Sequence, residues 1–138
     1  MTAFTQIHSA LSLLPSFSQL ELSANLHLLS VVLRKDTGEL LVQLVTNYSS
    51  NSITLHWALG ASSSSRWSNP TVWGVNLPEN STVVEECAVR TPLKLAFGCL
   101  QLTLELPRLE APVYLLFALN EGEKWFNNDG RNFSIRLT

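Results

Sequence analysis

The feature of this chain that most constrains its fold is a period-two alternation of apolar and polar residues. In ITLHWALG, residues 53–60, the odd-numbered positions are apolar and include Trp57, while His56 stands among the even-numbered positions. Successive side chains of a β-strand point to opposite faces of the sheet. The stretch therefore predicts a strand with Trp57 in the core and His56 pointing away from it.

The same alternation predicts strands at 20–34, 40–48, 82–89, 95–107, 113–121 and 132–138. Turn residues separate them, and 113–121 is almost wholly apolar, as a covered central strand would be. A helical turn or two is expected only within FTQIHSALSLL, residues 4–14, and 61–81 is expected to form a long loop. We predict an all-β fold, an antiparallel β-sandwich of about seven to eight strands, in one domain spanning 1–138.

The composition favours a neutral partner. Charged residues make up only 14% of the chain, the net charge is −2, and lysines and arginines do not cluster. Nucleic acid needs concentrated basic charge, so it is not expected as a partner. No apolar run reaches the roughly 18 residues of a membrane span, so a membrane is not expected either.

Motifs for catalysis and metal binding are weak. The serines lack a G-x-S-x-G elbow, and no pair stands out among the acids Glu85, Glu86, Glu105 and Glu121. The oxygen-rich stretch 127–132 fits a tight hairpin better than a calcium loop. We therefore predict no catalytic residue, no metal site and no cofactor. The sequence leaves open whether Cys87 and Cys99 form a disulfide or remain free thiols.

The tryptophans outside the alternation carry the functional signal. Trp67 and Trp73 lie in the Ser/Pro/Asn-rich loop, and Trp125 begins a polar turn. A sugar ring stacks its C–H face on indole, and its hydroxyls bond to amide and charged side chains. The pattern thus predicts sugar binding. The alternative is an Ig-like protein–protein interaction module in which the loop aromatics are binding hot spots.

Three stretches resemble a known family in their order along the chain: TLHWALGASSSSRWSNP (54–70), AVRTPL (88–93) and VYLLFALNEGEKWFNNDGRNFSIRL (113–137). They are similar to the N-terminal starch-binding modules of plant and algal α-glucan, water dikinases, which are family 45 carbohydrate-binding modules. The resemblance implies a non-catalytic sandwich that binds α-1,4-glucan (starch, maltodextrin) and serves an attached glucan-phosphorylating enzyme. It implies a plastid location, or a cytoplasmic one in algal hosts that store their glucan there. Whether the chain is complete or one module of a longer enzyme is left open.

The layout also resembles the smaller starch-binding families 25 and 53, where an outward histidine and two tryptophans form the sugar platform. Carried over by position, His56, Trp67 and Trp125 would form the platform here. The nearby hydrogen-bonding groups would be Lys124, Asn127, Asn128 and Asp129. Trp73 is predicted to be a second platform, a lid, or a cover for the sandwich edge. Nothing in the sequence resembles the phosphohistidine domain or nucleotide-binding loop of a dikinase.

Overall fold

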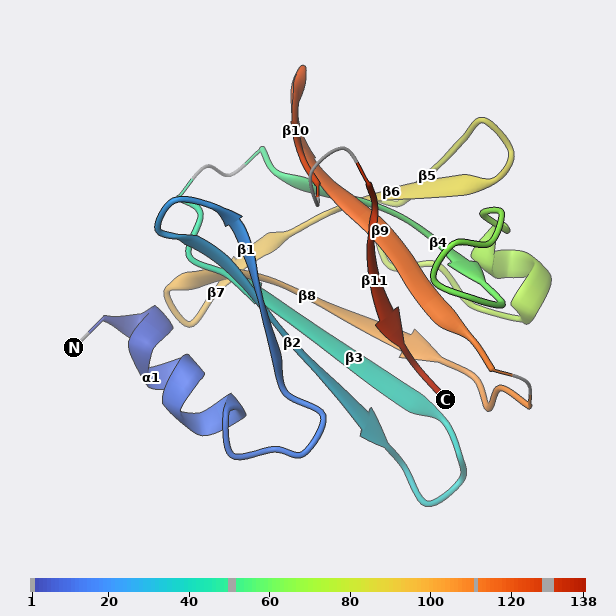
Figure 1. Cartoon of the computed structure of the whole chain (residues 1–138), viewed down its shortest axis with the longest axis horizontal. Helices are drawn as coiled ribbons and strands as arrows, with labels where there is room; N and C mark the ends of the chain where they lie inside the picture. The colour runs from blue at the N-terminus through green and yellow to red at the C-terminus, as the bar shows by residue number, and fades with distance from the viewer. Residues whose placement is uncertain (1, 50–51, 111, 128–130) are drawn as a thin grey trace.

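Two antiparallel β-sheets pack face to face in the computed structural model, which describes residues 2–49, 52–110, 112–127 and 131–138 (Figure 1). Sheet A has the strand order β1 (Ser18–Ser23), β2 (Leu26–Arg34), β3 (Leu40–Thr46), β8 (Cys99–Leu106) and β7 (Lys94–Ala96). Sheet B has the order β10 (Lys124–Phe126), β9 (Tyr114–Glu121), β4 (Thr54–Gly60), β6 (Ala88–Pro92) and β5 (Thr82–Val84), and β11 (Phe133–Arg136) also pairs with β9. The prediction of an all-β antiparallel sandwich is confirmed.

The core fills the space between the sheets with alternate residues of each strand. Trp57 and Phe117 are the largest side chains without solvent exposure, and leucines and valines of both sheets surround them. The indole Nε1–H of Trp57 donates to Thr91 Oγ1 at 2.9 Å, which satisfies a buried polar group. The predicted core position of Trp57 is confirmed.

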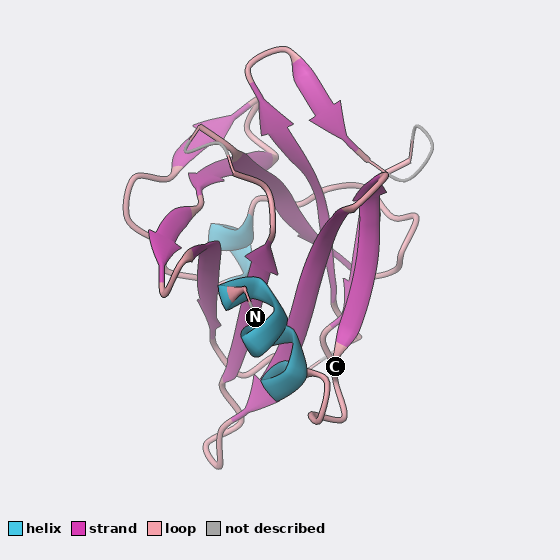
Figure 2. Ribbon diagram, turned by 90° about the vertical axis from the view of Figure 1, so that its left-hand side faces the viewer, coloured by secondary structure: helices cyan, strands magenta, loops and turns pink. Residues whose placement is uncertain are grey.

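One helix covers part of the outer face of sheet A. Helix α1 (Ala3–Leu11) starts where Thr2 Oγ1 accepts a hydrogen bond from the backbone N–H of Thr5. It packs Phe4, Ile7 and Leu11 against a small second core around Leu29. Figure 2 shows the helix lying across the strands. The helix expected near the N-terminus is confirmed. No helix in the described ranges is long and apolar enough to cross a bilayer.

Three stretches that were expected to be single strands are hairpins. Residues 20–34 turn at Asn25 (φ 63°), 82–89 turn at Glu85 and Glu86 (φ 54° and 64°), and 95–107 turn at Phe97 and Gly98. Since most of these turn residues are not glycine, their left-handed backbone left no recognisable signal. The described residues therefore form eleven strands rather than seven or eight. The gap between the predicted strands 82–89 and 95–107 is also shorter than expected, because β6 continues through Pro92 and β7 begins at Lys94.

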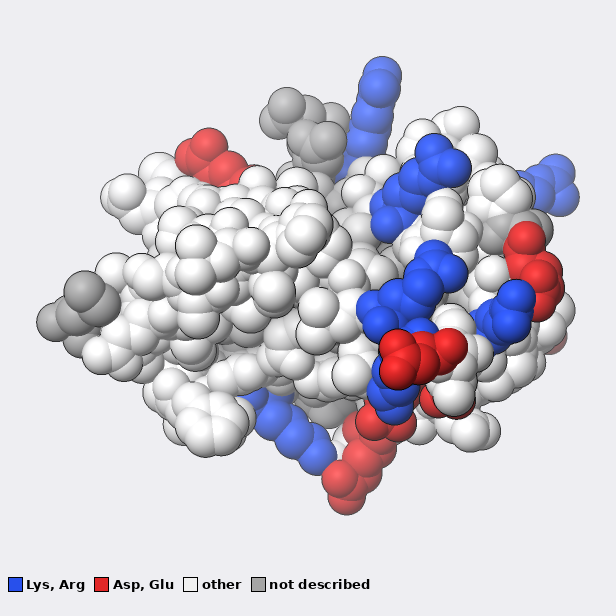
Figure 3. Space-filling view, turned by 90° about the horizontal axis from the view of Figure 1, so that it is seen from below, with Lys and Arg blue, Asp and Glu red and all other residues white. Residues whose placement is uncertain are grey.

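Surface charge contributes little to holding the sandwich together. On the face seen in Figure 3, charged side chains gather on one half, and the half toward α1 is almost free of them. The ion pairs Lys35–Glu39, Lys94–Glu79 and Arg108–Glu110 are all between exposed side chains. Such pairs contribute about 0–1 kcal/mol each, so the apolar core dominates stability. Cys87 and Cys99 are both free thiols, and Cys99 lies beneath α1 on sheet A.

Candidate functional site

His56 lies on the outer face of sheet B, as the alternation predicts. In the sheet register it stands between Arg90 on β6 and Ala118 on β9. Because Ala118 has only a methyl group, the row beside His56 is left open to larger rings from neighbouring segments. His56 itself is half-buried. This row of three residues forms the base of the site.

Trp67 reaches His56 because the loop after β4 folds back on its own strand. Leu59 and Ser68 exchange backbone hydrogen bonds of 3.1 and 2.9 Å. The close approach requires Gly60, where a Cβ atom would come within 2.2 Å of Ser65 Oγ. The ring centroids of His56 and Trp67 are 5.2 Å apart, and the ring planes make an angle of 37°.

Trp125 comes from the short edge strand β10. Opposite faces of that strand carry Trp125, which is 43% exposed, and Phe126, which is buried in the core. Phe126 packs edge-on against Tyr48 at 5.3 Å, and the Tyr48 hydroxyl donates to the carboxylate of Glu121. Trp125 meets His56 at a centroid distance of 5.2 Å and an angle of 79°. The core therefore anchors the strand that presents Trp125.

A shallow pocket of about 300 Å³ lies among these rings. Besides His56 and the two indoles, it is lined by Glu85, Cys87, Ala88, Ala118, Asn127 and Asn132. Since one indole makes 37° with the His56 ring and the other makes 79°, the two indole planes differ by at least 42°, the difference between those angles. The pocket thus offers two inclined aromatic faces with amide and carboxylate groups beside them.

Arg90 lies behind His56 and Trp125. Its Nε–H donates to His56 Nδ1 at 3.4 Å, and its guanidinium carbon is 5.5 Å from the centre of a Trp125 ring. Burial and the neighbouring Arg90 cation lower the pKa of His56, and the carboxylate of Glu85 opposes this shift. His56 is therefore neutral at pH 7.

Comparison with known proteins assigns the chain to a family. The family described as "Alpha-glucan water dikinase 1 Ig-like N-terminal domain" has a model that matches residues 18–137. The chain belongs to this family.

Two curated relatives carry the same region. The alpha-glucan water dikinase, chloroplastic, of Citrus reticulata is 32% identical over 99 residues, which cover 70% of this chain and 6% of that protein. The alpha-glucan water dikinase 1, chloroplastic, of Arabidopsis thaliana is 30% identical over 118 residues, which cover 84% of this chain and 8% of that protein. The chain thus spans less than a tenth of the length of either relative. No solved structure matches it significantly.

In this member of the Ig-like N-terminal domain family, four of the predicted site residues line one pocket: His56, Trp67, Trp125 and Asn127. Lys124 points to the other face of β10, where its Nζ lies 5.0 Å from the centre of the Phe126 ring. Asn128 and Asp129 lie outside the described residues, and so does the centre of the hairpin or calcium loop considered for 127–132.

Trp73 takes a different position. It ends the short 3₁₀ helix η1 (Pro70–Trp73), is half-buried and packs against the main core. It does not line the pocket around His56. Of the three roles considered for it, the arrangement fits a cover for the sandwich.

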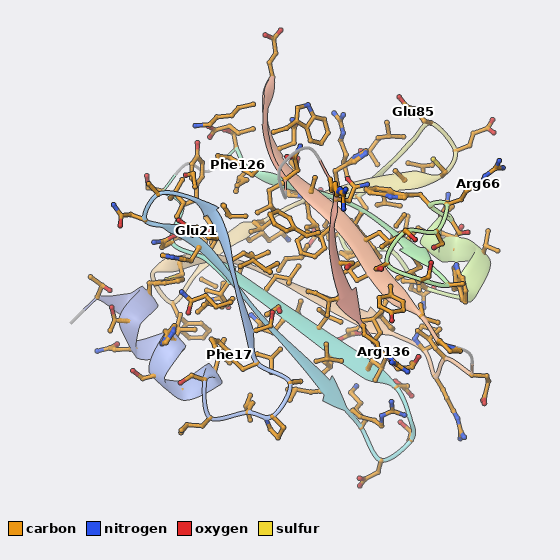
Figure 4. The ribbon with its side chains drawn as sticks, viewed as in Figure 1. Phe17, Glu21, Arg66, Glu85, Phe126 and Arg136 are labelled. Carbon is orange, nitrogen blue, oxygen red and sulfur yellow. The ribbon has the colours of Figure 1, made fainter. Side chains whose placement is uncertain are left out.

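Six residues of the site were not identified from the sequence. Five of them line the pocket, namely Glu85, Cys87, Ala88, Ala118 and Asn132, and the sixth is Arg90 behind it. Glu85 stands at the tip of the β5–β6 hairpin (Figure 4). Arg90 adjoins His56 only through the strand register, across 34 residues of chain. Asn132 lies within the stretch 113–137 that resembles the starch-binding modules, and it is an amide like the predicted Asn127. This likeness was the available sequence signal for its place in the pocket.

Proposed function

We propose that this domain binds α-1,4-glucan chains without catalysis, as a family 45 carbohydrate-binding module, in the pocket formed by His56, Trp67 and Trp125. The observation that carries the proposal is the pair of indoles held on one histidine at the protein surface. Each centroid lies 5.2 Å from the His56 ring. An aromatic face of this kind accepts the C–H face of a sugar ring.

The polar groups of the pocket suit sugar hydroxyls. Asn127 and Asn132 each carry an amide donor and acceptor, and Glu85 carries an acceptor. His56 adds a ring N–H donor. Such a mixed set fits a ligand in which every hydroxyl both donates and accepts. Strong binding of a polyanion is not expected, because a carboxylate lines the pocket.

The inclination of the indoles favours a bent glucan. Two sugar rings that stack on planes at least 42° apart must themselves be turned relative to each other. Consecutive residues of an α-1,4-linked chain are turned in this way as the chain coils. A β-1,4-linked chain runs flat, so it would fit two coplanar rings better. We therefore expect α-linked oligosaccharides to bind more tightly than β-linked ones of equal length.

The relatives supply the biological setting of the proposal. Both are named as chloroplastic alpha-glucan water dikinases, and the matched region is less than a tenth of their length. A small glucan-binding domain would hold an attached glucan-phosphorylating enzyme against starch inside the plastid. Weak, reversible contact suits this task, because the enzyme must move along its substrate. Since the ligand is neutral, affinity should depend little on salt.

Calorimetric titration of the chain with maltoheptaose tests the proposal, with cellohexaose as the β-linked comparison. Heat release and a change in tryptophan fluorescence are expected with maltoheptaose, and a much weaker response with cellohexaose. Sedimentation with insoluble starch, which soluble maltodextrin reverses, provides a second test. A titration with no heat release and no fluorescence change, together with no retention on starch, would overturn the proposal.

The rival proposal is a protein-docking module in which the same aromatics are hot spots. The 43% exposure of Trp125 is the observation in its favour, because a half-exposed indole is a common interface anchor. The starch experiment separates the two: maltodextrin competes only when the indoles bind sugar.

A further inference from the structure

Arg90 contacts two members of the pocket without lining it. Its Nε–H reaches His56 Nδ1 at 3.4 Å, while its guanidinium lies over the Trp125 ring at 5.5 Å. The side chain is half-buried on strand β6, which is flanked by β4 and by the edge strand β5. A charged group in this place interacts with ligand-contacting side chains rather than with the ligand.

The contact with His56 decides which ring nitrogen carries the proton. A nitrogen that accepts a hydrogen bond cannot bear a hydrogen, so Nδ1 is the unprotonated position and Nε2 carries the N–H. The alternative tautomer would direct an N–H at the Arg90 guanidinium. The other titratable groups that face His56 are Glu85 and Cys87, both on the β5–β6 turn, whereas β9 presents only Ala118. Arg90 is therefore the group that sets the tautomer.

The contact with Trp125 fixes the angle of an indole face. A guanidinium over an indole is attracted to its π electrons. The guanidinium donates its Nε–H to His56 while its central carbon lies over the Trp125 ring, and a lysine ammonium does not offer this fixed pair of contacts. One side chain thus couples the orientation of the imidazole to that of Trp125.

We infer that Arg90 is a positioning residue of the proposed sugar site: it holds His56 with Nε2–H available to a sugar oxygen and keeps Trp125 inclined for stacking. The inference rests on the proposed function where it names a sugar as the ligand. The positioning itself rests on the contacts of Arg90 with His56 and Trp125. It predicts that loss of Arg90 weakens binding although no ligand contact is removed.

The test compares Arg90→Met, Arg90→Lys and the matched control Arg34→Met. Arg34 is an exposed arginine at the end of β2 on the other sheet, so its replacement removes the same charge far from the pocket. Two measurements are made on each chain: maltoheptaose affinity by calorimetry, and the protonation of His56 by ¹⁵N NMR of the free protein. The second needs no sugar.

We expect the wild type and Arg34→Met to show a single neutral tautomer with the proton on Nε2. Arg90→Met should show mixed tautomers and bind maltoheptaose about five- to thirtyfold more weakly. Arg90→Lys retains the cation and so keeps the pKa of His56 low, but it should not restore the single tautomer or the full affinity. A purely structural role would alter the melting temperature and leave the tautomer unchanged.

Two results would overturn the inference. One is a proton on Nδ1 of His56 in the wild type, which requires no variant to fold. The other is wild-type affinity in Arg90→Met. If the wild type binds no maltoheptaose, the proposed function fails, and the NMR measurement alone decides whether Arg90 orients His56.

Discussion

Replacing Trp125 with alanine should separate binding from folding. Trp125 keeps 43% of its side chain exposed. Taking roughly 250 Å² for a whole indole side chain, about 100 Å² is open to a ligand. At about 25 cal/mol per Å², covering all of it would contribute about 2.5 kcal/mol, and a sugar on one face about half of that. Trp125→Ala should therefore weaken maltoheptaose binding by about tenfold.

The assay is calorimetric titration with maltoheptaose, accompanied by thermal unfolding of each variant. Phe97→Ala is the matched control, because Phe97 is an exposed aromatic (89%) in the β7–β8 turn of the other sheet. Trp125→Phe keeps a smaller flat ring and should give intermediate affinity. If Trp125→Ala unfolds cooperatively and still binds like the wild type, the stacking argument is wrong.

Three other outcomes follow from the described contacts. Trp57→Phe removes the donor to Thr91 Oγ1, so the free energy of unfolding in urea should fall by about 1–3 kcal/mol with glucan affinity retained; unchanged stability would contradict the core assignment. The pKa of His56 is lowered, so below about pH 6.5 the unfolded chain binds a proton that the folded chain does not. The free energy of unfolding should thus decline as pH falls from 7.5 to 5.5, and this decline should be smaller in His56→Gln; an equal decline would refute the assignment. Burial raises the pKa of the Cys99 thiol, so iodoacetamide should modify Cys99 more slowly than Cys87. Because Cys87 lines the pocket, maltoheptaose should protect it from alkylation. Mass spectrometry of the alkylated chain measures both rates, and equal rates for the two thiols or no protection of Cys87 would contradict these expectations.

The sequence predicted the strands wherever burial on one face decides the pattern. Residues 53–60 alternate and 113–121 are almost wholly apolar, and β4 and β9 lie in these two stretches. The hairpin at Asn25 was missed for a physical reason. A two-residue turn pairs Ser23 with Leu26, so even-numbered residues face the core on both sides of it and the alternation continues unbroken. Periodicity alone cannot reveal such a turn.

The candidate site was partly predictable for a related reason. His56 follows from the strand alternation, and Trp67 and Trp125 follow from tryptophans placed where no apolar pattern needs them. Arg90 adjoins them only after two strands have adopted a particular register, which no local signal encodes. The misplaced residue, Lys124, shows the same limit: no strand was predicted at 124–126, where β10 lies, and the alternation within this strand turns Lys124 away from Trp125.

The three-residue strand β10 couples the surface to the interior. Phe126 is wedged against Tyr48 on one side of the strand, and Trp125 stands on the other. Because Phe126 is buried on the inner face, the backbone of β10 is held in place beneath the indole. An indole carried on an anchored strand would lose less conformational freedom on association than one carried on a free loop. In the proposed function, such a shallow pocket would bind a chain on encounter and release it quickly, so that attachment to a granule would come from many brief contacts rather than from one long-lived complex.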